Sequence, residues 1–240
     1  MVSIDSLVFQ IRHIAKLTYV VRYHARTDEN KTKMKNIFIL VLIVITVQKS
    51  FGQRISVFDS ITNEVQKLKL NCKANGNNKN ILKLLDNINA ELMEDENGSL
   101  SQKTVKLYED FTTNKNIDNY HIFYLFNIYQ NHITESAQLN KKANANFQIT
   151  VMKIISGQIS ETFKTIPDLI LLYMGEALIS GNRIELARSH FKKIAEFNPQ
   201  SVPLKVYCYL LSENQVEKDN YYKELKSKHS KHWMVIEKLK

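Results

Sequence analysis

The sequence predicts an all-α fold that is built from antiparallel helix pairs. Apolar residues recur at helical spacing along most of the chain, whereas the apolar-polar alternation of half-exposed strands is almost absent. Only six glycines and three prolines occur in 240 residues, too few for the many tight turns of a β-protein. Hydrophobic residues make up 44% of the chain, which is enough for a core, so we expect a folded helical array.

Residues 34–52 have the form of a secretory signal peptide. The segment begins with Met-Lys, continues with eleven residues, 37–47, that are apolar except for one threonine, and ends in a small-x-small pattern before a cleavage point between Gly52 and Gln53. A spanning helix takes about 20 apolar residues, whereas a signal core takes about 7 to 15. We therefore expect an exported protein, periplasmic or secreted, whose mature chain of 188 residues starts at Gln53.

The first 33 residues leave three interpretations open. The one we favour is a misassigned start codon, with translation starting at Met34. In the second, residues 1–33 are a cytoplasmic segment and the apolar run is a signal anchor, because Arg and Lys precede it. This alternative would make the protein membrane-anchored. The third is an organelle transit peptide, since residues 6–26 are basic, acid-free and partly amphipathic.

Removal of this leader changes the charge of the protein. Residues 1–52 hold eight Lys or Arg and three acidic residues, so the net charge falls from +9 for the chain to +4 for residues 53–240. Such a value describes an ordinary solvated surface, and no nucleic-acid partner is expected. The remaining basic residues gather at the C-terminal end, at Lys218, Lys223, Lys226, Lys228, Lys231, Lys238, Lys240, His229 and His232. We expect the solvated face of a helix there, with contact to an acidic partner or a membrane surface as the alternative.

Five helices are predicted before the clearest motif of the chain. The first covers residues 55–70 and the second, beyond a polar loop, residues 80–93. Ser101 and Asp118 are the predicted N-caps of the third and fourth helices, and residues 134–156 are predicted to form the fifth. The apolar residues that define the first four are Val57, Ile61, Val65, Leu68, Ile81, Leu84, Leu85, Ile88, Leu92, Val105, Tyr108, Phe111, Ile122, Leu125, Phe126 and Tyr129.

The fourth predicted helix is unusually aromatic. Its five aromatic residues within ten positions are Tyr120, Phe123, Tyr124, Phe126 and Tyr129, and they give it two apolar faces. The interpretation we favour is a central helix that is packed on both sides. The alternative is an aromatic groove for a peptide or a glycan, because rigid aromatic surface is common at recognition sites.

The sharpest pattern lies in residues 168–201. Its defining positions are Leu171, Met174, Gly175, Leu178, Ala187, Phe191 and Pro199. This spacing of large, small, aromatic and proline residues resembles a tetratricopeptide repeat, a pair of antiparallel helices. The small residues Gly175 and Ala187 would let the two helices approach closely, with the turn at Gly181-Asn182.

The resemblance covers one unit of 34 residues, so it implies either a right-handed α-solenoid or an irregular helical array. We expect a helical region with diverged pairs over residues 53–133 and a repeat-like region over residues 134–240. Because Tyr209 and Tyr221 replace the small residues of a next unit, its last part is expected to be a degenerate C-terminal cap. The core of that cap is predicted to be Leu210, Leu211, Leu225, Trp233 and Ile236.

The resemblance also implies a function. In such arrays the first helices of successive pairs form a concave surface that holds an extended segment of a protein or peptide partner. On the matched unit, the groove positions would be Leu169, Leu172, Tyr173 and Glu176. No cofactor is implied.

Residues suited to catalysis or metal binding form no recognisable pattern. The chain lacks the His-Glu-x-x-His, Cys-x-x-Cys, Gly-x-Gly-x-x-Gly, Gly-x-x-x-x-Gly-Lys and Gly-x-Ser-x-Gly motifs. His229 and His232 lie three residues apart but lack further ligands at suitable spacing, so we expect them to be solvent-exposed. His121, His132 and His190 stand alone and are expected to be ordinary surface or core groups.

Between Cys72 and Cys208 lie 135 residues, and both a disulfide and a free buried pair remain compatible with export. The prediction is therefore a non-enzyme: an exported helical-repeat module that binds a protein or peptide in the cell envelope, or acts as a scaffold there. The alternatives are a signal-anchored protein with a periplasmic helical domain and an envelope hydrolase without a recognisable motif.

Overall fold

The computed structural model describes residues 56–239 of the chain. Within this range the protein has ten α-helices and one π-helix and no strand, which confirms the all-α prediction. None of the helices in this range is long and apolar enough to cross a membrane. The predicted leader, signal segment and cleavage point at Gly52 and Gln53 lie outside the described residues.

The N-terminal part consists of short helices joined by polar loops. Helix α3 (Val57–Asn71) begins after Ser56, whose hydroxyl accepts the amide N–H of Asp59. Helix α4 (Asn80–Ile88) continues directly into the π-helix η2 (Asn89–Glu94), so the single helix predicted over residues 80–93 is in fact two segments of different winding. Helix α5 (Gln102–Thr113) begins after Ser101, as predicted, because the Ser101 hydroxyl accepts the Thr104 amide N–H.

Several hydrogen bonds join the loop after α3 to the turn that precedes the helix starting at Tyr120. Asn119 has a φ of 64°, its side-chain amide donates to the carbonyl oxygens of Asn75 and Asn78, and its Oδ1 accepts the Asn75 amide N–H at 2.8 Å. The Asp118 carboxylate accepts the side-chain amide groups of Asn75 and Asn78. The prediction that Asp118 caps the fourth helix is therefore wrong, because Asn119 occupies the N-cap position and the Asp118 carboxylate binds the loop after α3.

The first long pair of helices corrects the predicted boundaries. Helix α6 (Tyr120–Gln138) runs through the predicted domain boundary between residues 133 and 134, and helix α7 (Ala145–Phe163) follows after a short turn. The single helix predicted over residues 134–156 is therefore wrong. Asn140, with a φ of 50°, reverses the chain, and Asn144 caps α7 by accepting the Phe147 amide N–H.

The repeat-like unit forms the predicted helix pair. Helix α8 (Asp168–Ser180) and helix α9 (Ile184–Phe197) are joined at Gly181 and Asn182, where Asn182 has a φ of 56°. Ala187 and Phe191 are fully buried, and Pro199 follows the end of α9. The remaining pattern residues, Leu171, Met174 and Leu178, are half-buried against the same core.

The array ends in a pair and a short terminal helix. Helix α10 (Val202–Leu211) is capped by Ser201, helix α11 (Gln215–Lys228) returns beside it, and helix α12 (Trp233–Lys238) packs on α10. The residues of the predicted cap divide into two sets: Leu211, Leu225 and Trp233 are buried, whereas Leu210 and Ile236 are exposed and do not cover the core. The Phe191 ring stacks on Tyr207 with centroids 4.4 Å apart, which joins this last pair to α9.

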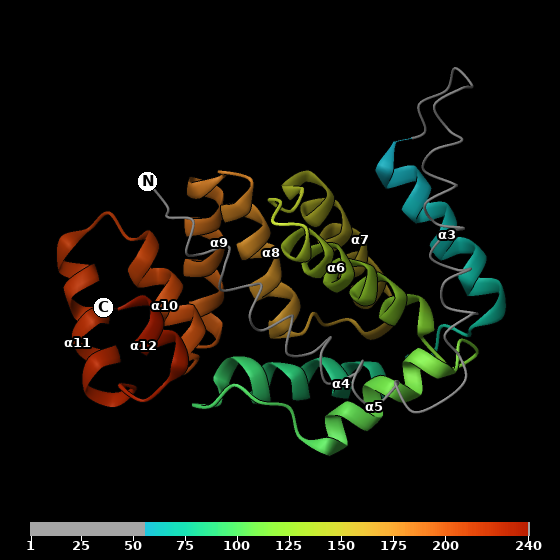
Figure 1. Ribbon diagram of the computed structural model, residues 1–240, viewed down its shortest axis with the longest axis horizontal. Helices are drawn as coiled ribbons and strands as arrows, with labels where there is room; N and C mark the ends of the chain where they lie inside the picture. The colour runs from blue at the N-terminus through green and yellow to red at the C-terminus, as the bar shows by residue number, and fades with distance from the viewer. Residues whose placement is uncertain (1–55, 240) are drawn as a thin grey trace.

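Three antiparallel pairs, α6 with α7, α8 with α9 and α10 with α11, thus follow one another along the molecule (Figure 1). The segment α4–η2 runs across this series and contacts α6, α8 and α10. Buried residues from α3 to α12 belong to one hydrophobic cluster, so the two regions predicted over residues 53–133 and 134–240 share a core.

Candidate functional site

The four predicted groove residues are buried. Leu169, Leu172, Tyr173 and Glu176 are at most 5% exposed, so they do not form an open surface, and the groove predicted at these positions is wrong for this structure. The physical reason is that α8 is apolar around most of its circumference, and a helix of this kind is covered on all sides. Helices α7 and α9 flank it, and α4 and η2 pack on it as well.

Two of these residues belong to an aromatic cluster inside the array. The Tyr173 ring stacks on Tyr129 at 5.4 Å and on Phe126 at 6.3 Å, and the Tyr207 hydroxyl donates to the Glu176 carboxylate. Burial raises the pKa of Tyr207 well above its usual value, and the Glu176 charge acts in the same direction. The first helices of all three pairs meet here, so the aromatic residues of α6 serve as packing, as in the interpretation we favoured.

The nearest approach to a nucleophile with a base is a buried Cys-His pair. Cys72 Sγ lies 3.7 Å from Nδ1 of His121, and both residues are buried. Burial raises the pKa of the Cys72 thiol and lowers the pKa of His121 to about 4, so both groups are neutral near pH 7. A reactive cysteine needs a depressed pKa, so this pair lacks an activated thiolate. Cys72 and Cys208 are both free thiols.

The other histidines hold the fold together. His132 Nε2 accepts the Asn144 amide N–H at 2.9 Å, and His190 Nε2 lies 2.8 Å from the Leu171 carbonyl oxygen. His232, which was expected to be exposed, is only 2% exposed because its ring caps α12, so that prediction is wrong. Across residues 56–239, His, Cys, Asp and Glu side chains form no group of three that could hold a metal ion.

An open hollow on the surface lies between α9 and α11. It has a volume of about 510 Å³ and is lined by Lys192, Asn214, Val216, Glu217, Asn220, Tyr221 and Glu224. Its polar and apolar groups are mixed, and its charges are paired: Lys192 Nζ lies 3.2 Å from the Glu217 carboxylate, and Glu224 contacts Lys205 at 2.8 Å. We refer to it as the α9–α11 hollow.

The floor of this hollow is positioned by hydrogen bonds around the turn between α10 and α11. Asn214 caps α11 by accepting the Glu217 amide N–H, and the Ser212 hydroxyl donates to the Glu217 carboxylate at 2.8 Å. Hydrogen bonds from Ser212 and Lys192 lower the pKa of Glu217. Glu217 is therefore fixed as an anion whose partners all come from α9 and the turn.

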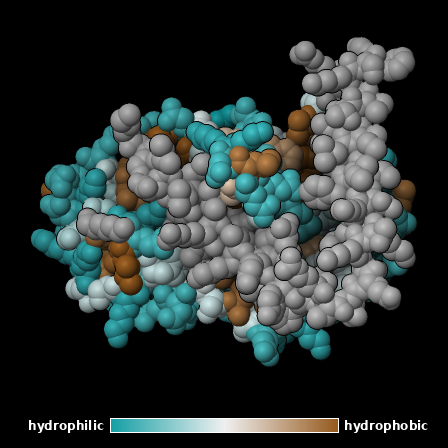
Figure 2. Space-filling model, in the orientation of Figure 1, coloured by the Kyte–Doolittle hydropathy of each residue, from teal (hydrophilic) through white to brown (hydrophobic). Residues whose placement is uncertain are grey.

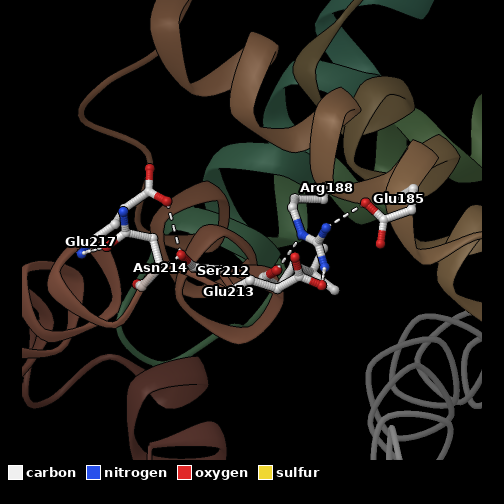
Figure 3. Close-up of polar contacts among 7 residues, drawn as sticks. Glu185, Arg188, Ser212, Glu213, Asn214 and Glu217 are labelled. Carbon is white, nitrogen blue, oxygen red and sulfur yellow. Dashed lines mark hydrogen bonds and ion pairs between the residues drawn. The ribbon is translucent and has the colours of Figure 1, made fainter.

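Arg188 ties α9 to the same turn (Figure 3). Its Nε donates to the Leu211 carbonyl at 2.6 Å, and its guanidinium also pairs with Glu213 at 2.7 Å and with Glu185. The Leu211 carbonyl is at the C-terminal end of α10, where carbonyl groups lack partners within the helix. Arg188 therefore satisfies this carbonyl and holds α9 against the C-terminal end of α10.

The exposed apolar residues of the described chain are spread over several helices. The largest are Val57, Phe58, Leu70, Leu139, Leu186, Phe197, Leu210, Val216, Tyr222 and Ile236. On the side of α10 and α11, the face in Figure 2 is mainly hydrophilic, with separate hydrophobic spots. Val216 differs from the other nine because it lines the α9–α11 hollow.

Comparisons with known proteins leave the family open. The chain matches no protein-family model, and neither a curated protein nor a solved structure matches it.

Sequence reasoning missed the residues that shape the hollow. One signal was present, because Asn214 and Glu217 stand at the spacing of a capping box. Arg188 had no such signal, since its main partners, Leu211 and Glu213, lie 23 and 25 residues away in the sequence.

Proposed function

We propose that this chain is an exported helical-repeat scaffold that binds a protein or peptide partner in the cell envelope. Three helix pairs in succession, one of which resembles a tetratricopeptide repeat, support the scaffold role. Such arrays gain extended surface as pairs are added, and their exposed helices serve as binding sites. Export is supported by the signal-like segment 34–52.

The observation that carries the binding proposal is the α9–α11 hollow. It is open to solvent, and its lining combines an exposed apolar side chain, Val216, with the amide of Asn220 and the ring of Tyr221. Amide groups can both donate to and accept from a polypeptide backbone, and tyrosine is enriched at protein interfaces. Because Lys192, Glu217 and Glu224 of the hollow all take part in ion pairs, its chemistry suits a mixed polar and apolar segment and not a strongly charged one.

The binding proposal is tested with a matched pair of surface variants. Full-length tagged protein is produced in its source cell, crosslinked in the envelope fraction and purified, and the captured proteins are identified by mass spectrometry. We expect Val216→Arg to abolish capture of a specific partner, whereas Leu139→Arg, which is similarly exposed at the distant α6–α7 turn, keeps it. Capture that is equal in both variants, or no capture above an unrelated bait, would overturn the proposal.

The export proposal has its own measurement. The mass and N-terminus of the natively produced protein distinguish a mature chain from Gln53, a chain from Met34 and a chain from Met1. A chain that starts at Gln53 supports signal cleavage. A chain that starts at Met34 supports the misassigned start but contradicts cleavage, and a chain that starts at Met1 overturns both hypotheses. Membrane association of the uncleaved chain would favour the signal-anchored alternative.

A catalytic role has no comparable support. The Cys72-His121 pair is neutral and buried, and the carboxylates of the hollow are held by lysines. An envelope hydrolase remains the alternative that an activity screen of the purified chain would test.

A further inference from the structure

The segment that begins at η2 is fastened to the C-terminal helix by contacts between residues about 140 positions apart. The Trp233 indole N–H donates to the Leu92 carbonyl at 3.0 Å, and His232 Nε2 lies 3.0 Å from the Met93 carbonyl oxygen. The backbone N–H of Trp233 also donates to the Glu96 carbonyl at 3.3 Å. We refer to these contacts as the C-terminal junction.

Both ring nitrogens of His232 are used at this junction. Nδ1 accepts the backbone N–H of Met234 at 3.2 Å, so it carries no proton. Nε2 faces the Met93 carbonyl, which has no hydrogen to donate, so Nε2 must carry the proton. Only the neutral ring with its proton on Nε2 satisfies both contacts, and a second proton would place two N–H groups against each other.

The surroundings of His232 disfavour its charged form. Its ring is buried, and burial is the main effect that lowers its pKa, with His229 acting in the same direction. The Met93 and Glu94 backbone and the Glu96 charge act in the opposite direction. Lys205 of α10 pairs with Glu224 of α11, and Glu224 also pairs with Lys228.

A second titratable group lies on the same segment. The Glu94 carboxylate accepts the Ser201 hydroxyl at 2.6 Å and the Val202 amide N–H at 3.1 Å, at the start of α10. Burial raises the pKa of the Glu94 carboxyl group above its value in the unfolded chain. The folded state therefore binds a proton at Glu94 more tightly than the unfolded state does, so acid does not weaken the folded state through Glu94. Sensitivity of the junction to acid therefore rests on His232.

We propose that the C-terminal junction is an acid-sensitive contact, in which protonation of His232 releases α12 from the segment 92–96 while the helix pairs stay folded. Loss of the Nδ1 acceptor removes the cap of a helix of only six residues, which is too short to persist without its packing. Release would uncover the buried side chains of Met234 and Val235, and so expose an apolar surface at the end of the array.

The chain carries its own reporter, because Trp233 is its only tryptophan. Trp233 emission and far-UV circular dichroism of the full chain are followed together from about pH 7.5 to about pH 5, the range in which histidines titrate. We expect the emission maximum to shift to longer wavelength before helix content is lost. His232→Asn keeps a good N-cap acceptor but cannot take up a proton, so the early shift should disappear. His229→Asn is the matched control: it should keep the early shift, which should begin at a slightly higher pH because His229 no longer disfavours the charged form of His232.

Two results would overturn this proposal. One is a wild-type protein whose emission and helix content change at the same pH, and the other is His232→Asn with an unchanged early shift. If His232→Asn does not fold, hydrogen exchange of the wild type gives the answer. Exchange in residues 229–239 should rise several-fold from about pH 7 to about pH 5.5, relative to α8 and α9 and after correction for the intrinsic rate. Equal protection at both pH values would overturn the proposal.

Discussion

A Cβ atom at Gly175 would lie 2.2 Å from Cζ of Phe191. Phe191 cannot retreat easily, because its ring stacks on Tyr207 and is fully buried. The glycine is therefore required by the contact between α8 and α9, and not by a special backbone conformation. This is the close approach that the repeat-like pattern predicted.

Gly175→Ala is expected to destabilise the protein. Overpacking of a tight core costs about 1 to 3 kcal/mol, and the better helix propensity of alanine returns up to about 1 kcal/mol. We expect a net loss of about 1 to 2 kcal/mol in the free energy of unfolding, measured by urea denaturation. Gly157→Ala in α7 is the control, because a Cβ there meets no atom within 4 Å and should stabilise the protein slightly. Equal effects of the two substitutions would contradict the packing argument.

Substitutions at Asn119 should separate backbone strain from hydrogen bonding. Asn119→Gly tolerates the φ of 64° but loses the side-chain hydrogen bonds to Asn75 and Asn78. Asn119→Ala loses the same bonds and adds the strain of a left-handed conformation. We expect a loss of about 2 to 3 kcal/mol for glycine and about 1 kcal/mol more for alanine. An alanine variant as stable as the glycine variant would show that strain does not matter here.

The sequence was sufficient where local chemistry decides the structure. Ser101 caps its helix through a hydroxyl group that accepts from an amide three residues on, and Gly181-Asn182 forms a turn within four residues. These signals need no distant partner, so they could be predicted from spacing alone. The apolar stripe of α6 was predicted for the same reason.

Features that depend on distant residues were missed. Tyr173 and Glu176 are covered by α6 and α10, whose Tyr129 and Tyr207 contact them from 44 and 31 residues away in the sequence. The hydrogen bond from the Ser201 hydroxyl, at the start of α10, to the Glu94 carboxylate joins residues 107 positions apart. The α9–α11 hollow likewise requires knowledge of which helices become neighbours. Periodicity predicts which face of a helix is apolar, but not what covers it.

The stability of the protein should fall in acid because of His121. Its folded-state pKa, about 4, lies below the unfolded value of 6.5, so the unfolded chain binds more protons between these two values. Stability is therefore complete above about pH 6.5 and is lost as the pH falls toward 4, by up to about 3 kcal/mol. Urea denaturation at pH 7 and at pH 5 measures this loss.

The variant that tests the origin of this effect is His121→Leu. It removes the titrating ring, so the dependence of the unfolding free energy on pH should become shallower, although the other histidines with lowered pKa values, His132, His229 and His232, preserve part of it. Cys72→Ala is the control, because it leaves the buried ring in place and should keep the wild-type slope. An unchanged slope in His121→Leu would mean that another group is responsible.

The hydrogen bond from Arg188 to the Leu211 carbonyl should contribute more to stability than the ion pair of Arg188 with Glu213. Glu213 is largely exposed, and surface ion pairs contribute about 0 to 1 kcal/mol, so Glu213→Ala is expected to cost less than about 1 kcal/mol. Arg188→Ala also removes a charged donor from the Leu211 carbonyl, a bond worth about 1.5 to 3 kcal/mol, so it should cost about 2 kcal/mol or more. The loss should be nearly independent of salt, because the carbonyl is neutral.

If the hollow binds the partner, Arg188→Ala should also reduce capture at a temperature where the variant is folded, whereas Glu213→Ala should not. Equal stability losses in the two variants, or a loss that disappears at high salt, would show that Arg188 acts through its ion pairs and not through the Leu211 carbonyl.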